Sequence, residues 1–121
     1  MDTHFGKMIF QTHPAELARR QKVAQWPLCV LDVRPAADFA AGHIPGALSL
    51  PAGAPTALPA GATPTTEIVV VGAGLSDPAM RATSLALLGL GARRVVELTE
   101  GMLGWRLAAM AVERHQPARA A

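Results

Sequence analysis

The chain of 121 residues has the length of one compact domain, and half of its residues are hydrophobic, so it can bury a core. Its formal charge is only +2, and positive residues cluster only in two short groups, at 19–22 and 93–94. With two tryptophans and no tyrosine to stack on bases, this composition argues against a nucleic-acid-binding protein.

One cysteine, Cys29, excludes an internal disulfide and a cysteine-based zinc site, and the four histidines are scattered, so we expect no metal and no cofactor. The first ten residues lack the apolar core of a signal peptide, and no apolar run approaches the ~20 residues that cross a bilayer. We therefore expect a cytoplasmic protein without membrane contact. Its single domain should span residues 8–114, followed by a flexible tail at 115–121.

The first third of the chain predicts a strand, a helix and a second strand. Residues 8–10 suit a short strand, and Pro14 suits the first position of a helix whose inner residues would be Leu17, Val23 and Ala24. Residues 28–33 are almost continuously apolar, which is typical of a strand covered on both faces. Cys29 lies within this strand, where a thiol is usually a small core group.

The next segment predicts a short helix at 35–42 anchored by Phe39, a tight turn at 43–46, and a third strand at 47–50 closed by Pro51. Residues 51–66 are rich in Pro, Ala, Gly and Thr, so we expect a mobile surface connection there.

The central stretch predicts a buried strand at 67–71, a glycine turn at 72–74, and a helix that begins at Asp77-Pro78 and ends near Gly91. Such a turn directs backbone N–H groups and the positive end of the helix dipole toward one point, which suits an anion. The helix at 79–90 is apolar around most of its surface, so either both sides are buried or one side meets a protein partner or a second copy of the chain.

The last part predicts a strand at 93–98 and a helix from Gly101 to about Glu113, with Trp105, Ala108, Ala109 and Val112 on one buried stripe. Strands thus alternate with helices along the whole chain. This alternation favours an α/β fold with an open parallel sheet of about five strands and helices on both faces.

Two stretches resemble a known family. The segment LDVRPAADFAAGHIPGALSLP is similar to the N-terminal signature of the rhodanese-like domain, and LTEGMLGW resembles the family's lead-in to its last helix. The resemblance covers residues 23–112 and implies a rhodanese-like sheet. The residues that carry the motif are expected to be structural: Asp32, Arg34, His43, Gly46 and Trp105.

The resemblance also implies a sulfurtransferase site with a nucleophilic cysteine after the fourth strand. This chain has Gly72 there, or Gly74 if the alignment is shifted by two residues to favour the helix. A persulfide needs a thiolate, and Cys29 lies in the middle of another strand. Ser76 has no neighbouring histidine to act as its base, so we expect it in a turn. Asp77 is placed to cap the following helix with its own carboxylate, which puts an internal anion at the site.

These observations leave three functions open. The first is a catalytically inactive rhodanese-like domain that works as a binding or regulatory module, with no catalytic residue. Its vestigial loop, which could still bind a small anion, comprises Gly72, Ala73, Gly74, Leu75, Ser76 and Asp77. The second is a sulfurtransferase with an unconventional or partner-supplied nucleophile. The third is nucleotide binding through Gly72-Ala73-Gly74, with Glu97 as the ribose-binding acid; Asp77 at the third glycine position of G-x-G-x-x-G disfavours it.

Overall fold

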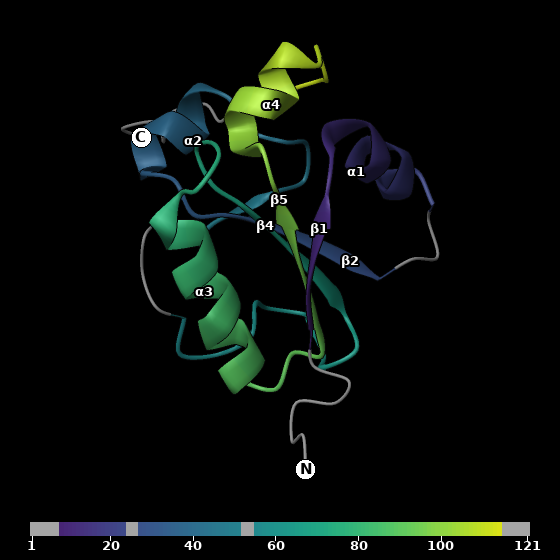
Figure 1. Ribbon diagram of the computed structural model, residues 1–121, viewed down its shortest axis with the longest axis vertical. Coiled ribbons are helices and arrows are strands. Elements are labelled where there is room, and N and C mark those ends of the chain that lie inside the picture. The colour runs from purple at the N-terminus through teal and green to yellow at the C-terminus, as the bar shows by residue number, and fades with distance from the viewer. Residues whose placement is uncertain (1–7, 24–26, 52–54, 115–121) are drawn as a thin grey trace, which may run out of the picture.

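The computed structural model describes residues 8–23, 27–51 and 55–114. They form five strands and four helices, shown in Figure 1. The strands are β1 (Met8–Thr12), β2 (Leu28–Asp32), β3 (Leu48–Ser49), β4 (Glu67–Val71) and β5 (Arg94–Leu98). The helices are α1 (Pro14–Gln21), α2 (Ala36–Ala41), α3 (Pro78–Gly89) and α4 (Gly101–Leu107). Among the described residues, no helix is long and apolar enough to cross a membrane.

All strands are parallel, in the order β1-β5-β4-β2-β3, with β4 at the centre. Every residue of β4 is buried, because helices cover both faces of the sheet. One core contains Leu17, Phe39 and Trp105, from α1, α2 and α4. The opposite core contains Met80 and Leu87 of α3. The predicted α/β fold with an open parallel sheet and helices on both faces is confirmed.

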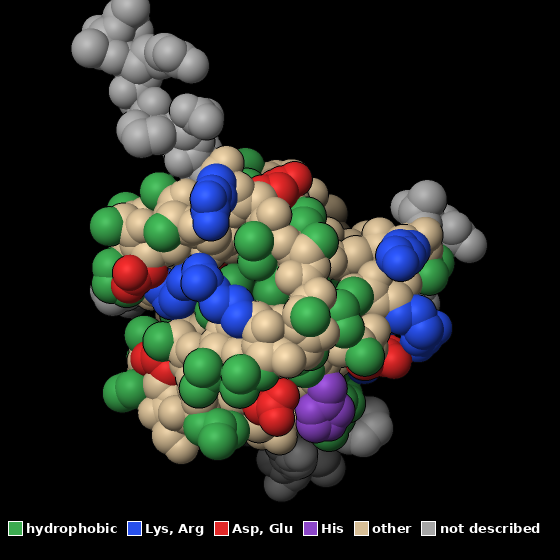
Figure 2. All heavy atoms as spheres, turned by 90° about the horizontal axis from the view of Figure 1, so that it is seen from above, with side chains coloured by type: hydrophobic (Ala, Val, Ile, Leu, Met, Phe, Trp, Pro, Cys, Tyr) green, Lys and Arg blue, Asp and Glu red, His purple; other side chains and the backbone are tan. Residues whose placement is uncertain are grey.

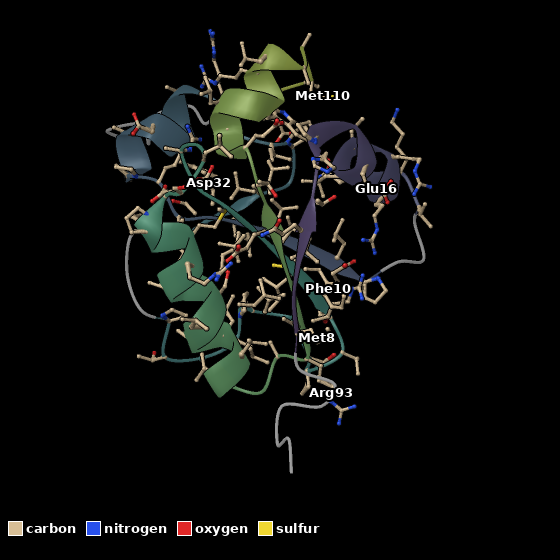
Figure 3. All side chains as sticks on the ribbon, viewed as in Figure 1. Met8, Phe10, Glu16, Asp32, Arg93 and Met110 are labelled. Carbon is tan, nitrogen blue, oxygen red and sulfur yellow. The ribbon has the colours of Figure 1, made fainter. Side chains whose placement is uncertain are left out.

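Because all strands are parallel, their amino ends lie along one side of the sheet and their carboxyl ends along the opposite side. Asp32, the last residue of β2, lies at the upper end of the sheet in Figure 3, and Met8 and Arg93 lie at the lower end. The upper end is the carboxyl edge, from which the loops lead into the helices. Ligand sites of open α/β sheets form at this edge.

Several predicted boundaries are corrected by the structure. The third strand extends over Leu48–Ser49 rather than 47–50, because it is an edge strand that pairs with β2 through these two exposed residues alone. The first helix ends at Gln21, so Val23 lies outside it and is half-buried, and Ala24 lies outside the described residues. The described residues between β3 and β4 form turns, with no helix or strand. The predicted tail at 115–121 also lies outside the described residues.

The last helix is shorter than predicted, and the expected buried stripe is wrong. The helix ends at Leu107; of the four stripe residues only Trp105 is buried, while Ala108, Ala109 and Val112 are exposed. Ala109 has a φ of 58°, and the N–H groups of Ala109 and Met110 donate to the carbonyls of Arg106 and Trp105. This is a Schellman ending with alanine in the left-handed position where glycine is usual.

Candidate functional site

The loop Gly72–Asp77 lies at the carboxyl edge of the central strand, directly before α3 (Figure 1). The predicted capping by Asp77 is confirmed: its Oδ1 accepts a hydrogen bond from the Ala79 N–H at 3.0 Å. Its Oδ2 accepts a second bond from the Ala73 N–H at 2.8 Å. The carboxylate thus joins the beginning of the loop to the first turn of the helix, at the end of the helix where the dipole favours a negative charge.

Gly72 lies immediately beside that carboxylate. A Cβ atom built on Gly72 would be 2.6 Å from Asp77 Oδ2 and 2.9 Å from Asp77 Cβ. Both distances are shorter than real side chains tolerate, so Asp77 stands in the space that a side chain at position 72 would enter. A cysteine side chain at this position and the present Asp77 side chain therefore exclude each other.

Helix α4 is bonded to the same loop through its N-terminus. The N–H groups of Met102 and Leu103 donate to the carbonyls of Gly72 and Ala73 at 2.9 and 3.0 Å. Gly101 has a φ of 59°, and a Cβ on it would lie 2.6 Å from the Gly74 nitrogen. Only glycine allows the helix to approach the loop this closely.

The outer side of the loop is apolar. Ser76 is exposed in a turn with a φ of 59°. Leu75 is 68% exposed, and Leu103 and Leu107 of α4 are 58% and 79% exposed. These three leucines line a hollow of about 330 Å³ with Glu100. Figure 2 looks down on this end of the molecule and shows hydrophobic side chains beside basic and acidic ones.

Cys29 is remote from the loop. It pairs with Ile68 near the amino end of the sheet, and the four-residue step from Ile68 to Gly72 spans about 13 Å along the strand. Burial raises the pKa of the Cys29 thiol, which disfavours a thiolate. Cys29 is therefore too far from the loop to act there, and its thiol favours the protonated form.

Asp32 and Arg34 form a buried ion pair at the end of β2. Arg34 Nη2 lies 2.9 Å from Asp32 Oδ2, and the Arg34 backbone N–H donates to Asp32 Oδ1 at 3.0 Å. Arg34 Nη2 also donates to the carbonyl of Gly42 at 2.7 Å. The pair therefore fixes the ends of α2 relative to the sheet.

His43 is buried by stacking and hydrogen bonding. Its ring lies parallel to Phe39 with 3.8 Å between centroids, and its Nδ1 is 2.8 Å from the Phe39 carbonyl.

The backbones of His43 and Glu113 exchange two hydrogen bonds, and Glu113 Oε1 accepts from the Gly46 N–H at 3.1 Å. Trp105 Nε1 donates to the Ala111 carbonyl at 2.8 Å. The residues after α4 are thereby attached to the 43–46 turn.

Glu97, the ribose-binding acid of the nucleotide hypothesis, forms an ion pair with Arg81. Its two oxygens accept bonds of 2.8 and 3.0 Å from the guanidinium. Burial pushes the pKa of Glu97 upward, but hydrogen bonds from Arg81 and Ser84 and the charge of Arg81 outweigh it and hold the pKa below the ordinary value. This pair lines a cleft of about 300 Å³ beside the loop. The sequence alone does not pair these two residues.

The sequence placed Gly101 and Glu100 in the LTEGMLGW motif and Glu113 at the end of the last helix, but it did not predict the contacts that these residues make. Gly101, the first glycine of LTEGMLGW, is the one signal in the sequence for the close approach of α4 to the loop. Among the described residues, no three His, Cys, Asp or Glu side chains gather as a metal site requires.

Comparison with known proteins agrees with this fold. The model of the family described as Rhodanese-like domain matches residues 13–108. A protein of Mycobacterium tuberculosis named an HTH-type transcriptional regulator is 34% identical over 103 residues, which are 85% of this chain and 44% of that protein. The present chain thus spans less than half the length of this relative.

Two solved structures are similar over most of the chain. The rhodanese-like domain of the Alr3790 protein from Anabaena sp. has a TM-score of 0.72 and 27% identity, covering 94% of this chain and 89% of that one. A thiosulfate sulfurtransferase from Pseudomonas aeruginosa has a TM-score of 0.75 and 25% identity, covering 93% of this chain and 23% of that one. The sheet, the order of its strands and the match of the family over residues 13–108 together show that this chain belongs to the rhodanese-like domain family.

Proposed function

We propose that this domain does not transfer sulfur and works instead as a binding or regulatory module. The observation that carries the proposal is the carboxylate of Asp77, which accepts a bond from the Ala73 N–H and lies beside Gly72, a residue without a side chain. Sulfur transfer through a persulfide needs a thiolate in that place. A fixed negative charge there repels both a thiolate and an anionic sulfur donor such as thiosulfate.

The relative in Mycobacterium tuberculosis supports a regulatory setting, because its name assigns it to transcriptional regulators. A domain of this kind within a longer polypeptide would pass on a binding event rather than carry out chemistry. We place the contact with a protein partner on the loop side, at Leu75, Leu103 and Leu107. The helix at 79–90 is a weaker candidate, since Leu85 is its one large hydrophobic residue among the exposed ones described.

The test is a sulfurtransferase assay on the purified protein with thiosulfate and cyanide, read as thiocyanate, together with intact-mass measurement for a bound sulfur. We expect no turnover above the buffer rate and no added mass of sulfur. Turnover that persists in the Cys29→Ala variant would overturn the proposal and support an enzyme with an unconventional nucleophile. Turnover abolished by Cys29→Ala would overturn it as well and assign the nucleophile to β2.

A second pair of variants tests whether Asp77 blocks the loop. Gly72→Cys alone places its side chain against Asp77, whereas Gly72→Cys with Asp77→Gly removes the carboxylate and the Cβ that crowd it. Glycine is also an acceptable N-cap residue, so the helix start is retained at a cost of a few tenths of a kcal/mol. We expect iodoacetamide at neutral pH to alkylate the introduced thiol faster in the double variant than in the single one. Equal rates would show that Asp77 does not control this space.

A further inference from the structure

Arginines from the two basic groups, which are separate in the sequence, come together at the amino end of the sheet. Arg19 and Arg20 from the end of α1 line a cleft of about 550 Å³ with Val23 and Arg94, the first residue of β5. The loop Gly72–Asp77 follows the other end of β4, about 13–16 Å away along the strand. This cleft is therefore distinct from the loop.

A buried carboxylate holds two of the arginines in place. Glu67 is 2% exposed, and its Oε2 accepts a bond of 3.0 Å from Arg20 Nη1 and one of 2.7 Å from Arg94 Nε. Arg20 Nη2 contacts the other oxygen of the same carboxylate. The two guanidinium groups thus share one buried carboxylate, which fixes the positions of both.

Arg94 keeps donors available for a ligand. Its guanidinium carbon lies 4.1 Å above the centre of the Phe10 ring, which orients the group, and only its Nε donates to Glu67. Its two Nη atoms make no hydrogen bond to another described residue, and its side chain is 43% exposed. Arg19, paired with Glu16 on the surface, adds a second exposed guanidinium at the rim. Figure 3 shows Phe10 and Glu16 on the same side of the molecule.

We propose that this cleft binds a small organic oxyanion, a phosphate monoester or a carboxylate with an apolar body. A guanidinium offers two parallel N–H donors that match two oxygens of such a group, and its charge strengthens both bonds. Val23 provides an apolar contact beside the arginines. The volume lies within the range of small-molecule sites. The cleft shares no residue with the loop, so binding in the cleft does not depend on whether the loop transfers sulfur.

The experiment is a titration of the full chain, labelled with ¹⁵N, with phenyl phosphate and, in parallel, with inorganic phosphate at low ionic strength. We expect the amides of Arg20, Val23 and Arg94 to shift, and phenyl phosphate to bind more tightly than phosphate because of its apolar ring. Raising the salt to about 0.5 M should weaken binding, since screening shortens the reach of the charges.

Arg94→Gln and Arg19→Gln test the cleft, and Arg93→Gln is the matched control. Arg93 is adjacent and carries the same charge, but it does not line the cleft. We expect Arg94→Gln to weaken phenyl phosphate binding about tenfold, as loss of a bond to a charged group implies, and Arg93→Gln less than about twofold. Because Arg94→Gln also removes a partner of Glu67, Arg94→Lys keeps the charge and should show an intermediate loss.

Three outcomes would overturn the inference. The first is the absence of amide shifts around the cleft at millimolar phenyl phosphate. The second is an equal loss of affinity in Arg93→Gln and Arg94→Gln, which would show a diffuse surface charge in place of a site. The third is tighter binding of a single-stranded oligonucleotide that depends equally on Arg93 and Lys22, which would assign the basic surface to nucleic acid.

Discussion

Replacing Asp77 with alanine removes two hydrogen bonds from one carboxylate. Loss of the bond to the Ala79 N–H is the loss of an N-cap, which costs about 1 kcal/mol. The bond to the Ala73 N–H lies on an exposed loop, so its loss adds about 1 kcal/mol, toward the low end for charged acceptors. We expect the free energy of unfolding to fall by about 2 kcal/mol and Tm by roughly 6–8 °C.

The measurement is urea unfolding of each variant followed by circular dichroism, with the slope m held in common if it does not change. Asp77→Asn keeps one carbonyl acceptor for the cap and should lose about half as much. Asp38→Ala is the matched control, because Asp38 is an exposed acid in the first turn of another helix. A free energy for Asp77→Ala within about 0.5 kcal/mol of the parent, the usual range of surface substitutions, would refute the assignment of Asp77 as the residue that holds the loop.

Three further predictions concern other parts of the domain. Ala109→Gly should stabilise the protein by about 0.5–1 kcal/mol, because it relieves the left-handed alanine, whereas Ala108→Gly should destabilise it by a similar amount in the same urea experiment. Arg34→Ala leaves Asp32 buried without its partner and should cost about 3–5 kcal/mol; a loss below about 1 kcal/mol would contradict a buried pair. The lowered pKa of Glu97 means that the stability it provides is present above about pH 4.5 and is lost as the pH falls below that value. Glu97→Gln should therefore show a flatter dependence of unfolding free energy on pH below about 4.5, and an unchanged dependence would refute this origin.

The elements whose hydrophobic pattern is strong could be predicted closely from the sequence. The strand at 67–71 is one of these: residues 68–71 form a continuous apolar run, and all five positions of the strand are buried in the sheet. The end of α4 could not be predicted in this way. Alanine favours helix and gives no sign that Ala109 adopts a left-handed conformation. The segment after it is held by the Trp105 indole, which donates to the Ala111 carbonyl, and by the bonds of Glu113 to the distant 43–46 turn.

In the candidate site too, local contacts could be predicted from the sequence and long-range contacts could not. Capping by Asp77 is a local interaction, so the Asp-Pro pair before an apolar helix is enough to predict it. The second bond, to Ala73, depends on how the loop folds back on itself, and the cleft at Arg94 depends on which strand starts lie beside α1. Such long-range contacts leave no periodicity in the sequence.

The two bonds from the start of α4 to Gly72 and Ala73 have a mechanical consequence. The loop cannot change shape alone, because its carbonyls accept hydrogen bonds from the first turn of the helix. The backbone at Gly101 also lies directly against the backbone of the loop. A change that displaces Gly72 or Ala73 would therefore also displace the start of α4, so the central loop and this helix move together.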